Sequence, residues 1–424
     1  MTTAEQRLQE KLTRFHDAVA LKEPDRIPIL SPGTNTFYAA DAGFTMAETI
    51  YDYDKARLAM KHYLEHYDID SGITFPSGLE GQGKILERAD AKAVLWAGMP
   101  GGKIKDPDVH QFIEFELMND GELGEMTQNL DYFTLFKYLP RAYGLLKPME
   151  KIQPTQSFQM SMHALGLVPL GASLLDPEVQ DMIVGLQEIT ATFGELIGKV
   201  GAWAQEQETE MGFPVMTGAP EVNSFDFYSD FLRGTMLASV DVYDDPELLD
   251  EWLTKYCDLQ LERMKANPPQ PGRIMFMPMH KGMDGFLSDE HYGRFYWPHL
   301  MRLITAWIDA GAIPYVYTEG SYETRMKYLE QLPVGKTIVH FEEGDPVQIK
   351  KQLKDVAAVS GLFPVSLLER GTTEQVAEEA KRLIDVLGDG GGYVFDIEGG
   401  IYDTAKRENW ETLIETVQTY GKYR

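Results

Sequence analysis

Short apolar runs alternate with amphipathic segments through most of the chain, and four runs in its C-terminal half end at a polar or charged residue. These runs cover residues 274–280, 313–319, 337–340 and 393–398. Runs of this length, bounded by Gly, Pro and charge, are typical of strands buried in a parallel sheet. In an α/β barrel the C-terminal strand ends open on one face, and that face carries the chemistry. The pattern therefore predicts that His280, Glu319, His340 and Glu398 converge.

The remaining elements predict the fold class. Residues 26–30, 73–75, 214–217 and 356–360 are further expected strands, and helical patterns occupy much of the chain between strands from residue 177 onward. About eight strands alternating with helices indicate an α/β protein with a closed TIM (β/α)8 barrel. We expect one domain over residues 1–424, with an N-terminal helical extension (1–25) and an insertion covering one face (85–150).

Composition narrows the possible partners. The formal net charge is −27 over 424 residues, and such an acidic surface repels phosphate backbones and anionic membranes. Nucleic acid and membrane are therefore not expected as partners. The single cysteine, Cys257, excludes a disulfide framework and a thiolate-rich metal site. The N-terminus has no apolar signal core, and the apolar stretch 164–175 is too short to span a bilayer. A cytoplasmic location is the simplest expectation.

Two of the strand ends suggest a metal. Glu319 and His340 end adjacent predicted strands, which lie about 4.8 Å apart in a sheet. A carboxylate and a neutral imidazole suit an open, catalytic zinc site. The alternative is a hydrogen bond between the two side chains that pins two loops. Glu398 is the candidate third ligand, and it could instead cap a helix or accept backbone N–H groups. Glu342 and Glu343 are alternatives for the same role.

The other candidate residues would shape a pocket at the same face. His280 ends a Met-rich strand, and a lone His in such a position is more often a polar pocket residue than a metal ligand. Tyr317 shares its run with Glu319. Aromatic side chains crowd this predicted face and suit a flat, apolar substrate. They include Phe37, Tyr315, Phe341, Phe286 and Phe363.

The order of several motifs is familiar. It runs from Lys-Glu-Pro-Asp-Arg-Ile-Pro (22–28), through Gly-Phe-Leu-Ser-Asp-Glu-His-Tyr-Gly-Arg-Phe-Tyr-Trp-Pro (285–298) and Gly-Ala-Ile-Pro-Tyr-Val-Tyr-Thr-Glu (311–319), to Glu-Arg-Gly-Thr-Thr-Glu-Gln-Val (369–376) and Glu-Gly-Gly-Ile-Tyr-Asp (398–403). Together these segments resemble the uroporphyrinogen decarboxylase superfamily. The resemblance covers most of the chain, is strongest over 285–424, and implies a TIM barrel.

Two branches of this superfamily fit less well. True decarboxylases carry an Arg-rich N-terminal segment that grips porphyrinogen carboxylates, whereas residues 31–38 contain no Arg. Their late Gly-His-Gly-Ile becomes Glu-Gly-Gly-Ile at 398–401. The corrinoid-dependent thiol methyltransferases bind zinc through His-x-Cys, which is replaced here by Tyr-Thr-Glu at 317–319.

A third branch fits better. The chain is similar to the zinc-dependent methyltransferase I component of corrinoid-dependent O-demethylase systems, which carries a Glu and a His separated by twenty residues. Glu319 and His340 have this spacing, but Ile304 stands where the branch has another Glu. The resemblance implies zinc on Glu319 and His340, with Glu398 as our substitute third ligand.

The activity implied by this resemblance is anaerobic methyl transfer. The chain would move a methyl group from a small aromatic methyl ether to the cob(I)alamin of a partner corrinoid protein, with zinc as Lewis acid on the ether oxygen. Tyr317 or His280 would protonate the phenolate or hold the substrate. A uroporphyrinogen decarboxylase-like decarboxylase and a methylcobalamin:thiol methyltransferase remain alternatives, as does a non-catalytic barrel that binds a small molecule or a corrinoid partner.

Overall fold

The centre of the fold is a parallel sheet that closes on itself. In the computed structural model, five strands pair in the order β3–β4–β5–β6–β7, all in parallel. Isolated parallel bridges continue this sheet through Val359–Tyr393, Ile29–Phe395 and Gly72–Val215. The amide of Asp70 donates to the carbonyl of Ile29 and joins the last two segments. Within the described parts of the chain, eight segments therefore form the ring of an α/β barrel, and the predicted fold class is confirmed.

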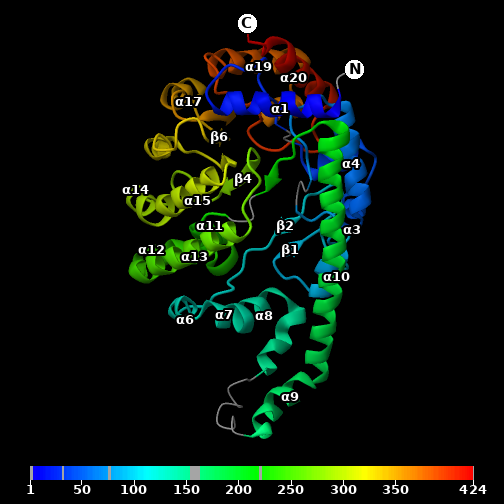
Figure 1. Ribbon diagram of the computed structural model, residues 1–424, viewed down its shortest axis with the longest axis vertical. Helices are drawn as coiled ribbons and strands as arrows, with labels where there is room; N and C mark the ends of the chain where they lie inside the picture. Colours follow the sequence, from blue (N-terminus) through cyan, green and yellow to red (C-terminus); the bar gives the residue numbers. More distant parts are fainter. Residues whose placement is uncertain (1–2, 31–32, 75–77, 153–162, 219–221, 424) are drawn as a thin grey trace.

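The structure describes residues 3–30, 33–74, 78–152, 163–218 and 222–423 (Figure 1). The named strands of the barrel are β3 (Thr217–Gly218), β4 (Ile274–Met279), β5 (Ile313–Thr318), β6 (Ile338–Phe341) and β7 (Ala358–Gly361). The predicted strand 73–75 is represented by a pairing at Gly72, and Phe75 lies outside the described residues.

Helices cover the outside of the ring and its N-terminal end. The longer ones are α1 (Ala4–Val19), α4 (Tyr53–His66), α10 (Pro177–Glu206), α12 (Thr235–Asp244), α13 (Pro246–Ala266), α15 (Trp297–Asp309), α17 (Pro346–Leu353), α19 (Thr373–Leu387) and α20 (Arg407–Tyr420). A capping box begins α19, because the Thr372 side chain accepts from the amide of Gln375 while the Gln375 side chain accepts from the amide of Thr372. No helix in the described ranges is long and apolar enough to cross a membrane.

Two segments whose sequences have helical periodicity are broken in the structure. The pattern over 225–237 becomes α11 (Ser224–Tyr228), a π-helical turn η6 (Ser229–Arg233) and a break at Gly234, whose φ is +81°. The pattern over 322–332 becomes the short turns η8 (Glu323–Arg325) and α16 (Met326–Leu329). Both interruptions lie at the C-terminal end of the barrel, where loop geometry overrides helical periodicity.

Side-chain alternation separates the barrel interior from the helix layer. Leu30, Ile274, Ile313, Ile338 and Val394 form one buried cluster inside the ring. Phe15, Ala18 and Val19 of α1 join the same cluster, so α1 plugs the N-terminal end of the barrel. Met275, Met277 and Met279 belong to the larger cluster beneath the helices. Along β4 these three residues alternate with the inward-facing positions that begin at Ile274, so their side chains pack outward and do not line the barrel interior.

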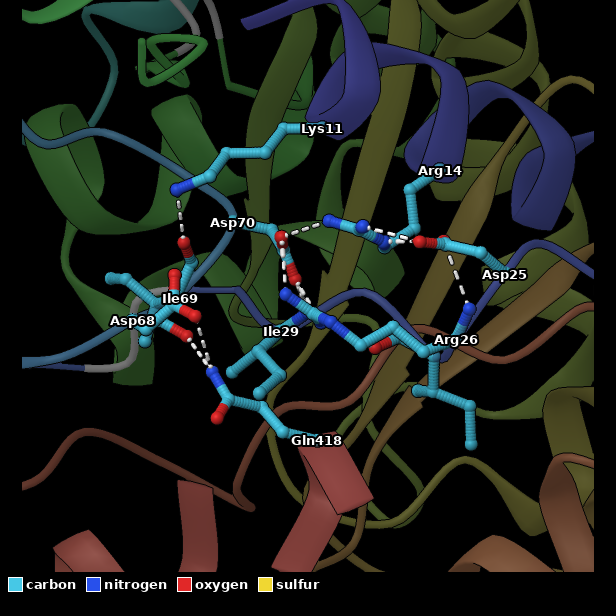
Figure 2. A network of polar contacts seen from close by, with 10 residues as sticks. Lys11, Arg14, Asp25, Arg26, Ile29, Asp68, Ile69, Asp70 and Gln418 are labelled. Carbon is cyan, nitrogen blue, oxygen red and sulfur yellow. Dashed lines mark hydrogen bonds and ion pairs between the residues drawn. The ribbon is translucent and has the colours of Figure 1, made fainter. Parts of the chain in front are cut away.

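A buried ion network fixes α1 to the first two barrel segments (Figure 2). Asp70 is fully buried and accepts from Arg14 at 2.6 Å, from Arg26 at 2.6 and 2.9 Å, and from the Ile29 amide at 2.8 Å. Arg14 also donates to Asp25 at 2.7 and 2.6 Å. The network contains two arginines and two aspartates, so each buried charge has an opposite charge beside it. These ion pairs therefore stabilise α1 at the N-terminal end of the barrel.

The elements from α5 (Gly83–Ala89) up to α10 lie beside the barrel (Figure 1). Strand β1 (Val94–Leu95) pairs with β2 (Gln111–Phe112) in an antiparallel hairpin, followed by α6 (Leu123–Gln128), α7 (Leu130–Phe133) and α8 (Leu139–Ala142). In Figure 1, α9 (Val168–Leu174) and the first turns of α10 extend away from the barrel. The assignment of 85–150 as an insertion, and of the whole chain as one domain, remains a prediction.

Candidate active site at the barrel mouth

A buried polar layer crosses the barrel below its mouth. The Tyr315 hydroxyl lies 2.8 Å from Nδ1 of His340 and 2.5 Å from Oδ2 of Asp396. His340 is fully buried, and its Nε2 lies 3.4 Å from the carbonyl oxygen of Glu398. Burial lowers the pKa of His340 to about 3, so its ring is neutral, and burial raises the pKa of Asp396 to about 7. These three side chains form the floor of the mouth.

Tyr317 connects this floor with the rim. Its ring stacks on His340 with centroids 3.9 Å apart and planes 10° apart. Its hydroxyl lies 3.3 Å from the carbonyl oxygen of Glu398 and 3.4 Å from Oε1 of Glu342. Glu342 also accepts from the Gly320 amide at 2.7 Å. Tyr317 is half-buried, as is Phe276 one strand away, so two aromatic rings stay accessible on the inner side of the mouth.

His280 and Asp230 form a hydrogen-bonded acid–base pair on the rim. Nδ1 of His280 lies 2.5 Å from Oδ2 of Asp230, and Lys281 Nζ lies 3.0 Å from Oδ1 of the same carboxylate. On the other side of the imidazole ring, Nε2 lies 3.4 Å from Oε1 of Glu319. The side chain of His280 is 30% exposed, that of Glu319 is 40% exposed, and that of Asp230 is 8% exposed. The imidazole is therefore fixed from below and accessible from above.

Local electrostatics favour the protonated imidazole. Burial opposes protonation of His280, but the hydrogen bond to Asp230 and the charge of Glu319 outweigh it and raise the pKa of His280 to about 9. The pKa of Asp230 is lowered despite its burial, because His280 and Lys281 both favour its charged form. An ionised carboxylate only accepts, so Nδ1–H of His280 donates to Asp230. The second N–H, on Nε2, is directed toward Glu319.

A buried carboxyl group anchors the rim from behind. Asp226 is fully buried on α11 and accepts from the amides of His280 (3.2 Å) and Lys281 (2.8 Å) and from the hydroxyl of Tyr296 (2.7 Å). Burial raises the pKa of Asp226 to about 7, against the opposing charge of His280.

The three predicted zinc ligands do not converge. Glu319 faces His280, the Glu398 carboxylate accepts from the Val365 amide at 2.9 Å, and the His340 ring is held by Tyr315 below the rim. Within the described ranges, no group of three or more His, Cys, Asp or Glu side chains is placed to hold a metal ion. As arranged here, this donor set does not fit zinc.

The predicted pocket aromatics divide between the two sides of the barrel wall. Tyr315 lies inside the barrel, and Phe286 is half-buried 5.7 Å from the Lys281 ammonium. Phe341 and Phe363 instead belong to the outward cluster beneath the helices. Phe37 lies on α2 (Asn35–Asp41) and packs against Tyr63 with centroids 5.9 Å apart. The mouth thus takes its aromatic surface mainly from Tyr317 and Phe276, and Phe276 was not predicted.

Asp226 and Asp230 were also not predicted. They stand four residues apart, a spacing that places both on one face of a helix. In the structure Asp230 lies within the π-helical turn η6, a feature that often accompanies functional sites. The pair of acids in 224–233 was visible in the sequence, but nothing there indicated that its face turns toward His280.

Comparison with known proteins agrees with this architecture. Residues 216–420, which contain all these rim residues, match the family model described as Uroporphyrinogen decarboxylase (URO-D). The matched residues make up just under half of the chain. The predicted resemblance is confirmed over this region, which runs from β3 to α20.

Two individual relatives show how far the likeness extends. Uroporphyrinogen decarboxylase of Anaeromyxobacter dehalogenans (strain 2CP-C) is 25% identical over 174 residues, 41% of this chain and 47% of that protein. The match thus spans about half the length of this curated relative. The solved structure of a methyltransferase from Methanosarcina mazei superposes with a TM-score of 0.58 at 11% identity and covers 99% of both chains. This superposition establishes the shared fold along the whole chain.

Proposed function

We propose that the chain is a methyltransferase that demethylates a small O-methyl substrate at the barrel mouth. The observation that carries the proposal is the His280 imidazole, held at Nδ1 by Asp230 and presented with its Nε2–H at the rim. The structural similarity to a methyltransferase from Methanosarcina mazei supports the same reaction class.

The chemistry calls for a proton donor in this position. As the methyl carbon bonds to an acceptor nucleophile, the C–O bond breaks and its electron pair stays on oxygen. A phenolate whose conjugate acid has a pKa of about 10 is a poor leaving group. His280, with a pKa of about 9, is well matched to protonate that oxygen, and such general-acid help contributes roughly 100- to 10,000-fold. Asp230 fixes the ring and stabilises its charged form.

The methyl acceptor is proposed to be the reduced corrinoid of a partner protein. The chain then needs no nucleophile of its own, which agrees with the burial of Cys257, its single cysteine. A proton from solvent would return the imidazole to its protonated form at the exposed Nε2 side, where the neighbouring Glu319 carboxylate favours the cation. Tyr317 and Phe276 would contact the flat face of an aromatic methyl ether.

The charge of the mouth favours this substrate over a porphyrinogen. Glu319, Glu342 and Glu398 surround the opening, and Lys281 is already paired with Asp230. Such a mouth repels a substrate that carries several carboxylates. A neutral ether carries no charge of its own, so these carboxylates do not repel it.

An anaerobic assay tests the proposal. The purified chain is mixed with chemically reduced cobalamin and a panel of neutral methoxyarenes, with methoxybenzoates and uroporphyrinogen as comparison substrates. We expect phenol release from neutral ethers, weaker turnover of the anionic ones, and no release of carbon dioxide. Decarboxylation of uroporphyrinogen without any demethylation would contradict the proposal.

A further inference from the structure

The turn that carries His280 is held by a carboxyl group that does not touch the imidazole ring. Asp226 accepts the backbone N–H groups of His280 and of Lys281, one on each oxygen, at 3.2 and 2.8 Å. These two amides follow the last residue of β4, where the ladder to β5 ends. Asp226 thus replaces sheet hydrogen bonds at the point where the backbone leaves the barrel.

Tyr296 completes this arrangement from a second element. Its hydroxyl donates to Oδ2 of Asp226 at 2.7 Å, and the side chain is fully buried in the π-helical turn η7 (Tyr292–Tyr296). The backbone carbonyl of Tyr296 accepts from Asn223 Nδ2 at 3.2 Å, and Asn223 is also the N-cap of α11. The same short helix therefore fixes both Asp226 and the residue that donates to it.

Gly282 shows how closely the turn is packed. A Cβ atom at this position would lie 2.5 Å from the Tyr322 hydroxyl and 3.0 Å from ring atoms of Tyr296. The Tyr322 hydroxyl in turn donates to the carbonyl of Met279 at 3.1 Å. The backbone is thus held by hydrogen bonds at 279, 280 and 281, and the side chains of Tyr296 and Tyr322 leave no room for a side chain at 282. Small movements of Tyr296 would be transmitted to His280.

We propose that Asp226 and Tyr296 are positioning residues for the acid–base group at the mouth. The pair sets the direction of the His280 backbone, so that Nδ1 reaches Asp230 while Nε2 remains at the rim. This inference rests on the proposed function for the role of His280, but its geometric content does not require an identified substrate.

The chain offers a matched control. Tyr228 is also fully buried, and its hydroxyl donates to Asp241 at 2.6 Å. Asp241 is bound by Arg233 at 2.8 Å and makes no contact that the structure shows with His280. Tyr228→Phe therefore removes the same chemical group from another buried pair on the same helix, whose hydrogen bond goes to Asp241 and not to Asp226.

The first measurement follows the Nδ1–H proton of His280 by NMR in the full-length protein, assigned by its loss in His280→Gln. A hydrogen bond as short as that to Asp230 is expected to give a resonance far downfield. We expect this resonance to shift or broaden in Tyr296→Phe and in Asp226→Asn, and to stay unchanged in Tyr228→Phe. An unchanged resonance in both site variants would overturn the inference, even if their thermal stability fell.

The second measurement separates this inference from the proposed function. For an active methyl donor, Tyr296→Phe should lower kcat about 10- to 100-fold with little change in KM, because the proton donor is misplaced while substrate contacts remain. Tyr228→Phe should lower stability without this loss in kcat. If the wild-type chain demethylates no donor, the proposed function fails, whereas the NMR result still decides the positioning role.

Discussion

The imidazole of His280 lies 2.5 Å from the carboxylate of Asp230, although 50 residues separate them in sequence. Asp230→Asn keeps the size of the side chain and removes its charge. We expect kcat for methyl transfer to fall about 100-fold with KM nearly unchanged, because the neutral amide no longer favours the protonated ring. Lys281→Met is the control, because it removes the ammonium group that pairs with Asp230 and leaves the carboxylate beside His280. We expect its kcat to fall less than that of Asp230→Asn. Full activity in Asp230→Asn would show that the hydrogen bond between Asp230 and His280 does not contribute to methyl transfer.

The buried ion network predicts a large stability effect far from the mouth. Asp70→Asn leaves Arg14 and Arg26 without full charge compensation, and breaking a buried pair costs about 3–5 kcal/mol. Urea unfolding measures the loss. Asp54→Asn is the control, because its pair with Lys199 is about half exposed and such pairs contribute at most about 1 kcal/mol. Similar losses in both variants would show that Asp70 does not fasten the α1 plug.

His299 predicts a specific pH dependence of stability. It is 4% exposed, neither ring nitrogen has a hydrogen-bond partner among the described residues, and burial lowers its pKa from 6.5 to about 4. Between these values the unfolded chain binds more protons, so the free energy of unfolding falls as the pH drops below 6.5. The contribution is about 2 kcal/mol at pH 5.

Urea unfolding of the wild type and of His299→Leu at pH 7 and pH 5 isolates this contribution. The variant should lose about 2 kcal/mol less than the wild type between the two pH values. Equal losses would show that His299 is not buried in its neutral form.

Metal analysis tests the arrangement of the predicted zinc ligands. We expect the zinc content of the anaerobically purified protein to be unchanged in Glu319→Gln and in His340→Gln, because the two side chains serve different partners. One zinc per chain that is lost in both variants would show that these residues move together on metal binding. In that case the metal, and not His280, would stabilise the leaving oxygen.

The sequence predicted the barrel because its strands are apolar runs ended by polar residues, a direct result of burial on both faces. It also located His280, Glu319, His340 and Glu398 at the strand ends. Depth was not predictable: His340 lies one layer below the rim, bonded to Tyr315 and stacked on Tyr317. Phe341 could have been assigned outward, since neighbours on a strand face opposite sides and His340 faces inward.

Asp226 and Asp230 were beyond sequence reasoning for a different reason. The helical pattern over 225–237 predicts one continuous helix, whereas the structure has a π-helical turn and a break at Gly234. The π-helical turn and the contacts with β4 decide which face meets His280. Such contacts depend on tertiary packing, which single-sequence periodicity does not contain.

The most direct test of the account compares two leaving groups in the wild type and in His280→Gln. One donor releases a phenol with a pKa of about 10, and the other releases a nitrophenol that leaves readily without a proton. Rates of methyl transfer to reduced cobalamin are measured for all four combinations. The account predicts a loss of roughly 100- to 10,000-fold for the first donor and a much smaller loss for the second. Equal losses for both donors would contradict the assignment of His280 as the group that protonates the leaving oxygen.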